Sequence, residues 1–165
     1  MREGNNATQP CPCGYYGDKN NRCNCTSVQI QNYTAKLSGP LLDRMDMHIE
    51  IGALPYADMR SINNGDSSET IRSRVNKARD IQKKRFQGLS RCITNSGMSS
   101  RMVEEYCKVD RNSMELLEKG VERLGLSARA YHRILKIART IADLDGSRSL
   151  EKHHLAEAIQ YRRIG

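Results

Sequence analysis

The sequence has 165 residues, with 27 Lys and Arg against 19 Asp and Glu, so its formal net charge is +8. No stretch approaches the length of about 18 apolar residues that a membrane span needs, and the polar first ten residues do not resemble a signal peptide. Hydrophobic residues make up 38% and aromatic residues 5%, with one Phe and no Trp. We therefore expect a cytoplasmic chain with an aliphatic core and no membrane partner.

The first 25 residues are rich in Cys, Gly, Pro and Asn, which predicts a loop unless a metal ion organises it. Four of the six cysteines lie here in the pattern CxC-x9-CxC, as Cys11, Cys13, Cys23 and Cys25. Four thiolates suit a structural zinc ion, although CxC pairs are rarer than wider pairs, and a flexible thiol-bearing loop is the alternative. The two remaining cysteines, Cys92 and Cys107, are predicted to be buried thiols.

The next elements are short. Thr26 can cap a helix that continues to about Lys36, and one further helical turn is expected at residues 41–44. Residues 47–51 alternate apolar and polar side chains, which predicts one half-buried strand. Residues 55–66 carry Pro, Gly, Asn and Ser without periodicity and predict a linker.

Helical periodicity dominates the rest of the chain. The first helix is expected from Ser68 to about Cys92. Its buried face should contain four apolar residues at helical spacing: Ile71, Val75, Ala78 and Ile81. Four more helices are predicted over residues 99–106, 111–123, 127–144 and 149–163. The predicted fold class is therefore mainly α, a helical bundle preceded by a Cys-rich loop, a short helix and one β-strand.

The positive charge is unevenly placed. Basic and acidic residues cancel up to Gly65, whereas eight basic residues accompany one acidic residue between Arg72 and Arg91. Such a window can neutralise phosphates. The candidates for nucleic-acid contact are Arg72, Lys83, Lys84 and Arg85. Because the basic positions wind around the helix, part of this set is expected to be solvated surface or a face for a neighbouring subunit.

Three stretches carry a family resemblance: CPCGYYGD at 11–18, LSGPLLDRMDMHIE at 37–50 and LSARAYHRILKIARTIADLD at 126–145. Together they resemble the C-terminal part of the magnesium-chelatase-like AAA+ ATPases of the ComM/YifB type, over residues 10–162. The resemblance implies that residues 10–54 end the ATPase core and that residues 67–165 form its helical lid. The family's complete proteins carry a phosphate-binding loop upstream. The sequence has no G-x-x-x-x-G-K-[ST] motif, so we expect a fragment that is inactive alone.

The resemblance also implies roles for three arginines. Arg44 corresponds to the arginine finger, which acts on the nucleotide of the neighbouring subunit. Arg129 corresponds to the sensor-2 arginine, which contacts the nucleotide of its own subunit. Arg133, four residues later on the same helical face, is the alternative phosphate contact. A guanidinium suits these roles because it stays charged and donates a planar fork of hydrogen bonds. Without the resemblance, each arginine would be interpreted as an ordinary solvated surface residue.

The implied function is that of a hexameric, ring-forming ATPase that binds ATP and Mg²⁺ and couples hydrolysis to DNA remodelling in recombination or competence. The alternative is an independent zinc-stabilised basic module that binds nucleic acid. Gln9 stands where the family usually has its sensor-1 Asn, and residues 1–9, which match poorly, are expected to be a non-native leader. The four histidines show no ligand-like spacing and are predicted to be core or solvated side chains: His48, His132, His153 and His154.

Overall fold

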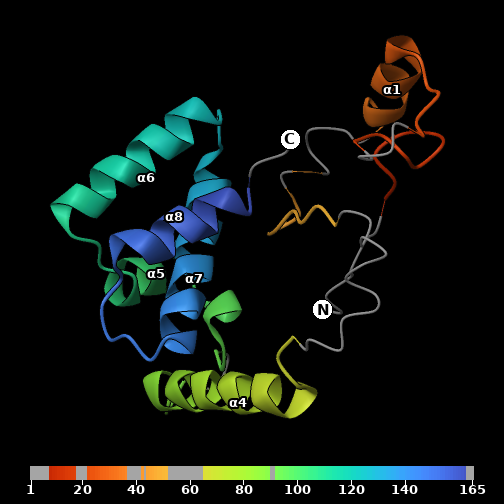
Figure 1. Ribbon diagram of the computed structural model, residues 1–165. Coiled ribbons are helices and arrows are strands. Elements are labelled where there is room, and N and C mark those ends of the chain that lie inside the picture. The colour runs from red at the N-terminus through yellow and green to blue at the C-terminus, as the bar shows by residue number, and fades with distance from the viewer. Residues whose placement is uncertain are drawn as a thin grey trace. The chain divides into compact units, whose positions relative to one another are not determined.

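Six α-helices and one short 3₁₀ turn make up most of the regular structure of the described residues, and Leu42 and Arg44, within the helical turn predicted at 41–44, are also helical (Figure 1). The computed structural model describes residues 8–17, 22–36, 42, 44–51, 65–89 and 92–162. They fall into two compact units. One contains the described residues up to Arg44, with Glu50 and Ile51, and the other contains residues 45–49 and everything from Gly65 onward. The predicted mainly α class is confirmed.

Helix α1 (Ser27–Thr34) follows the Cys-rich stretch and starts at the predicted cap. The hydroxyl of Thr26 accepts a hydrogen bond from the Gln29 backbone at 3.3 Å, and the Gln29 side chain accepts one from the Thr26 backbone at 2.9 Å. This reciprocal capping box satisfies two amide hydrogens that a helix start would otherwise leave unpaired. No residue of α1 is buried, so capping rather than packing stabilises this helix.

Helix α4 (Ser68–Arg85) ends earlier than predicted. The expected end near Cys92 is wrong because Gly88 has a φ of +86°, a left-handed conformation that stops the helix. The expected buried face is also wrong in its first half, where Ile71 is 48% and Val75 40% exposed. Only Ala78 and Gln82 are buried, so the N-terminal half of α4 extends beyond the core.

Helices α5 (Ser100–Tyr106), α6 (Arg111–Arg123) and α7 (Ala128–Leu144) begin within one residue of the predicted positions. Each has a side-chain cap of the type that sequence patterns reveal. The caps are Ser99, Asp110 and Ser127, whose oxygens accept hydrogen bonds from the amide three residues later.

Helix α8 (Lys152–Gln160) is shorter than the predicted 149–163. Glu151, which lies inside the predicted range, is instead the N-cap, and the preceding Leu150 is buried and forms an isolated β-bridge with Val109. The helix therefore starts only after Leu150 has entered the core.

The core of the second unit is built around α7, which contacts α4, α5, α8 and the 3₁₀ turn η1 (Asn95–Gly97). It is aliphatic as predicted, with Ile134, Leu117 and Leu155 fully buried. The single phenylalanine, Phe86, packs edge-on against Tyr106 with ring centres 5.6 Å apart. Cys92 and Cys107 are buried, which confirms that prediction.

Residues 47–51 do not form the predicted strand. A strand needs a partner, and no described residue pairs with this segment in a β-ladder. The backbone N–H of His48 instead donates to the carbonyl of Tyr161 at the end of α8. Most of the expected linker, residues 55–66, lies outside the described residues, as do most of residues 1–9 and part of the turn at 41–44. Among the described helices, none is long and apolar enough to cross a membrane.

Candidate metal and nucleotide sites

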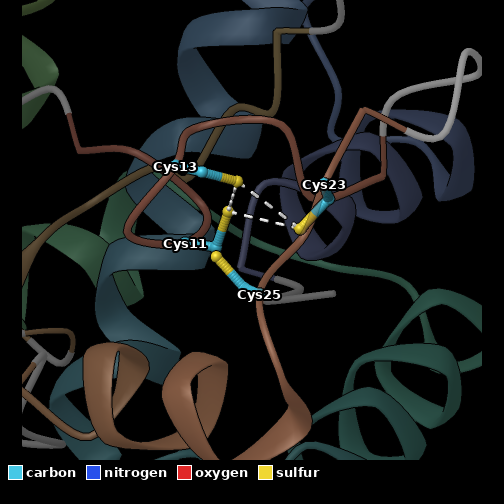
Figure 2. A group of neighbouring side chains, drawn as sticks. All are labelled: Cys11, Cys13, Cys23 and Cys25. Carbon is cyan, nitrogen blue, oxygen red and sulfur yellow. Dashed lines mark hydrogen bonds between the residues drawn. The ribbon is translucent and has the colours of Figure 1, made fainter.

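Four cysteines converge in the first unit (Figure 2). The Sγ atom of Cys11 lies 3.3 Å from that of Cys13 and 3.8 Å from that of Cys23, and the Cys13–Cys23 distance is 3.6 Å. Cys25 completes the group, with all four sulfurs within 4.8 Å of one another. In a tetrahedral site with Zn–S bonds of about 2.3 Å, neighbouring sulfurs lie about 3.8 Å apart. The three distances among Cys11, Cys13 and Cys23 are therefore close to the edge length of such a tetrahedron.

Backbone turns bring the first cysteine pair together. The N–H of Gly14 donates to the carbonyl of Cys11 at 3.1 Å, which closes a turn around Cys13. Gly14 and Gly17 have φ values of +81° and +80°, where a residue with a Cβ atom is strained. The sequence places glycine where the loop must reverse direction, which explains how 15 residues with few apolar side chains can gather four thiols.

The thiols of the cluster differ in acidity. Burial raises the pKa of the Cys11 thiol, but hydrogen bonds from the Cys13 side chain and the Tyr16 backbone outweigh it and lower that pKa to about 6. A hydrogen bond with the Cys13 backbone lowers the pKa of Cys25, but hydrogen bonding to the Cys13 side chain, burial and the other thiols raise it to about 12. Cys11 is thus ionised near neutral pH, whereas Cys25 loses its proton only when a cation compensates the accumulated charge.

The donor set fits Zn²⁺ better than a hard cation such as Mg²⁺, because all four ligand atoms are sulfur. A four-sulfur site is closed and leaves no position for a substrate, so its role would be structural. The flexible-loop alternative does not explain why all four sulfurs lie within 4.8 Å of one another (Figure 2).

A cationic pocket lies on the N-terminal half of α7 in the second unit. It has a volume of about 350 Å³ and is lined by Met98, Ser100, Val103, Arg129, His132, Arg133 and Lys136. The basic residues recur at spacings of three and four, so they share one face of α7. Lys136 Nζ donates to the carbonyl of Ser96 at 3.0 Å, and Arg133 Nη1 lies 2.6 Å from Asp46 Oδ1. We name this the α7 pocket.

The structure places both candidate phosphate contacts, Arg129 and Arg133, in the α7 pocket. Their environments differ, because Arg133 forms an ion pair with Asp46 whereas Arg129 is exposed and forms no ion pair with any described residue. Arg44, the candidate arginine finger, is an exposed residue of the first unit. The hollow is therefore surrounded by three cations and a histidine, which makes its local charge positive.

The candidate nucleic-acid contacts on α4 separate into two groups. Arg72, Lys83 and Lys84 are exposed, and Lys83 makes only a solvated ion pair with Asp80 at 3.6 Å. Arg85 does not belong with them, because its guanidinium points inward to Asp143 and its side chain is only 14% exposed. The expectation that Arg85 is a surface contact is corrected accordingly, and α4 keeps the other three as candidates.

Two polar groups of the second unit escaped prediction. The first joins α4, η1 and α7, where the buried Asp143 carboxylate accepts hydrogen bonds from Arg85, Asn95 and Arg139. Its members lie up to 58 residues apart in the sequence. The sequence signal for this group was Asp143 itself, a carboxylate in the apolar face of α7, since buried carboxylates require partners.

The second group contains Asp145, His153 and His154, whose ligand atoms lie within 4.8 Å of one another. The spacing of these residues in the sequence did not indicate this proximity, although the buried His154 and the exposed His153 agree with the prediction of core or solvated histidines. The Glu151 backbone donates to Nδ1 of His154 at 3.0 Å, so the proton of the neutral ring is on Nε2, 3.2 Å from Asp145 Oδ2. A metal ion at Nε2 would have to displace that proton. We therefore interpret His154 as a buried helix cap and not as a ligand.

Two family profiles match the chain. The profile of the family described as "Magnesium chelatase, subunit ChlI C-terminal" matches residues 65–162, and the profile "Magnesium chelatase, subunit ChlI" matches residues 5–59. The chain belongs to the magnesium-chelatase family. The ion pair between Asp46 and Arg133 thus joins residues from the two matched regions.

Curated relatives place it more closely within this family. Competence protein ComM of Haemophilus influenzae is 43% identical over 161 residues, which is 96% of this chain and 30% of the relative. The uncharacterised protein YifB of Escherichia coli is 40% identical, again over 96% of this chain and 30% of the relative. The predicted ComM/YifB type is confirmed. The chain spans about 30% of the length of these relatives, so it corresponds to a fragment of them.

Proposed function

We propose that this chain supplies the arginine finger and the sensor-2 lid of a ring-forming AAA+ ATPase that remodels DNA. The observation that carries the proposal is the α7 pocket, in which Arg129, Arg133, Lys136 and His132 surround a hollow large enough for a polyphosphate. Family membership supports the same reading, since ComM is by name a competence protein. Branch migration or a helicase-like step in recombination or competence is the proposed work of the whole ring.

The division of roles follows the positions of the arginines. Arg129 is the proposed phosphate contact of its own subunit, because its guanidinium lines the α7 pocket without an acidic partner among the described residues. Arg44 is the proposed finger, which donates to the phosphates held by the neighbouring subunit as negative charge develops there. ATP and Mg²⁺ would be held largely by residues upstream, since this sequence has no phosphate-binding loop motif. We therefore expect no ATP hydrolysis by this chain alone.

The cysteine cluster is proposed to hold a structural zinc ion. Its sulfur–sulfur distances of 3.3–3.8 Å support this assignment. The ion would fix the turns on either side of Gly14 and Gly17 in a stretch that has almost no apolar core of its own. Binding and folding of this segment are then one process.

A chimera tests the proposed function. The chain replaces the matching segment of Haemophilus ComM, and ATP hydrolysis is measured for the chimera and for its arginine variants. Arg44→Ala should lower the rate about a thousandfold, the effect typical of an arginine finger. Arg129→Ala should weaken nucleotide binding. Arg123→Ala, an exposed cation in the last turn of α6, is the matched control and should leave the rate unchanged.

Mixing subunits decides whether Arg44 acts across an interface. Arg44→Ala subunits are combined with subunits whose upstream phosphate-binding loop is disabled. Mixed rings should regain activity, because an intact nucleotide site can then face an intact Arg44. Full activity of Arg44→Ala in the unmixed ring would contradict the proposal.

The second candidate function is an independent zinc-stabilised module that binds nucleic acid without nucleotide. The exposed cations of α4 favour it, because Arg72, Lys83 and Lys84 stand on a helix with only two buried residues. The two candidates differ in what Arg44 does. Arg44→Ala should abolish the activity of a ring ATPase and should barely change binding by such a module.

A further inference from the structure

One ion pair links the α7 pocket to the segment that follows Arg44 in the chain. Asp46 Oδ1 lies 2.6 Å from Arg133 Nη1. The Arg133 side chain is only 19% exposed, whereas that of Asp46 is 60% exposed. Because Arg133 also lines the α7 pocket, an anion that enters the pocket lies near the guanidinium that pairs with the Asp46 carboxylate. Two anions beside one guanidinium repel each other and compete for its N–H donors, so binding of one disfavours contact with the other.

Two further hydrogen bonds, on either side of Asp46 in the sequence, hold the segment 45–49 against the helical bundle. The His48 N–H donates to the Tyr161 carbonyl at 2.7 Å, and the Met45 carbonyl accepts a hydrogen bond from the Arg162 guanidinium. Residues 45–49 accordingly belong to the same compact unit as the helical bundle. Asp46 provides the side-chain ion pair in this set of contacts and lies between the two backbone contacts in the sequence.

We propose that the Asp46–Arg133 ion pair couples anion binding in the α7 pocket to the position of Arg44. This inference rests on the proposed function, because it takes the anion to be a nucleotide phosphate. The Cα atom of Arg44 cannot lie more than about 7 Å from that of Asp46, since only two peptide units separate them. A phosphate that draws Arg133 away from Asp46 therefore loosens the residues that hold Arg44. Asp46 is a positioning residue, and the nucleotide state of one subunit thereby influences the finger offered to the next.

The coupling must act in both directions. If an anion in the pocket loosens segment 45–49, then loosening the segment must strengthen anion binding by the same factor. Removing the charge of Asp46 should consequently do two things at once. It should speed local opening at His48, and it should tighten the binding of a polyphosphate. A purely structural role of Asp46 predicts the first effect without the second.

The first measurement is hydrogen exchange of the His48 amide in this chain. Asp46→Asn should raise its exchange rate about fivefold, the effect of losing one partly buried ion pair. Asp66→Asn is the matched control, because it removes another Asp–Arg pair, that with Arg74 at 3.0 Å, on the exposed side of α4. The control should leave His48 unchanged. Exchange of the α7 amides reports whether the bundle of each variant remains folded. A change below twofold in Asp46→Asn would overturn the inference.

The second measurement adds inorganic tripolyphosphate as the probe and follows binding and His48 exchange together. Wild-type protein should exchange faster at His48 when the probe binds, and Asp46→Asn should bind the probe about fivefold more tightly. Arg129→Gln should weaken binding. If the probe binds through Arg129 but leaves His48 exchange unchanged, the coupling is wrong while the phosphate role of Arg129 stands. If the probe binds neither wild type nor Asp46→Asn, the phosphate role of the pocket fails and the coupling fails with it.

Discussion

Arg85 of α4 and Asp143 of α7 form a two-point ion pair, with Nη1 2.7 Å from Oδ2 and Nη2 2.5 Å from Oδ1. The Asp143 side chain is inaccessible to solvent, and it also accepts hydrogen bonds from Asn95 Nδ2 at 2.8 Å and Arg139 Nε at 3.1 Å. Arg139 reaches on to the carbonyls of Ser147 and Arg148 just beyond the end of α7. One carboxylate therefore organises α4, η1 and α7.

Replacing Asp143 by Ala should destabilise the bundle strongly. The change leaves two guanidinium groups without their shared anion, which in a buried site costs about 3–5 kcal/mol. Urea denaturation followed by circular dichroism measures the loss. Asp66→Asn, which removes an exposed ion pair, is the control and should cost less than about 1 kcal/mol. A loss for Asp143→Ala as small as that of the control would show that the network is not a stability determinant.

The cysteine cluster should bind one zinc ion per chain. Cys11→Ser or Cys25→Ser should each remove most of the metal, because a closed site requires all four sulfurs. Metal analysis of the purified variants measures this. Cys92→Ser, a buried thiol of the bundle, is the control and should retain the zinc. Equal metal content in all these variants would exclude the cluster as the site.

Zinc binding should release fewer than four protons near pH 7. The Cys11 thiol, with a pKa of about 6, is already ionised there, whereas the Cys25 thiol, with a pKa of about 12, must lose its proton to the solvent. Titration calorimetry in buffers of different ionisation enthalpy counts the protons. The apparent affinity should fall as the pH is lowered. A zinc affinity that does not change between about pH 8 and about pH 6 would contradict thiolate ligation.

Acid should weaken the contact of segment 45–49 with the bundle. Burial lowers the pKa of His48 below its usual 6.5, and the positive charge of Arg162 lowers it further. The unfolded chain therefore binds this proton more readily than the folded chain, and stability falls as the pH drops through 6.5 toward the lower folded-state value. An NMR titration should give a pKa below 6.5 for His48, and His48→Gln should remove its part of the pH dependence. His153→Gln, at an exposed position, should not.

The basic residues of α4 should make DNA binding depend steeply on salt. If Arg72, Lys83 and Lys84 each neutralise a phosphate, replacing all three by Gln should reduce the slope of log affinity against log salt by about three. Fluorescence anisotropy with duplex DNA measures the slope. Arg101, Lys119 and Arg123, also exposed but on α5 and α6, provide a triple Gln control with the same net charge. Equal slopes for both variants would show that net charge alone matters.

Local signals predicted the helices well. The starts of α5, α6 and α7 were predicted to within one residue, because the caps that begin them, Ser99, Asp110 and Ser127, bind amides only three positions away. The end of α4 was missed because the periodicity continues past Gly88, where the backbone turns left-handed. The predicted strand at 47–51 failed because alternation indicates a strand only when a partner is available.

In the candidate sites too, contacts between residues close in the sequence were predictable, whereas contacts between distant residues were not. Gathering of the four cysteines was foreseeable, since they lie within 15 residues and glycines separate the pairs. The assignment of Arg85 to the surface was wrong because its partner lies 58 residues away. Nor could spacing reveal the ion pair of Asp46 with Arg133, which depends on how the segment 45–49 packs against α7. The roles proposed for Arg44, Arg129 and Arg133 rest on the family resemblance and not on residue spacing.

The central place of α7 has a consequence for how the protein unfolds. Helices α4, α5 and α8 and the turn η1 all contact α7, and α6 contacts α8. None of these elements can therefore detach without exposing apolar side chains of a neighbour to solvent. The second half of α4 and residues 92–162 should thus behave as one cooperative unit that unfolds in a single transition. Helix α1 and the first half of α4 bury almost nothing and can open separately, so they are the parts of the chain free to reorder when a partner arrives.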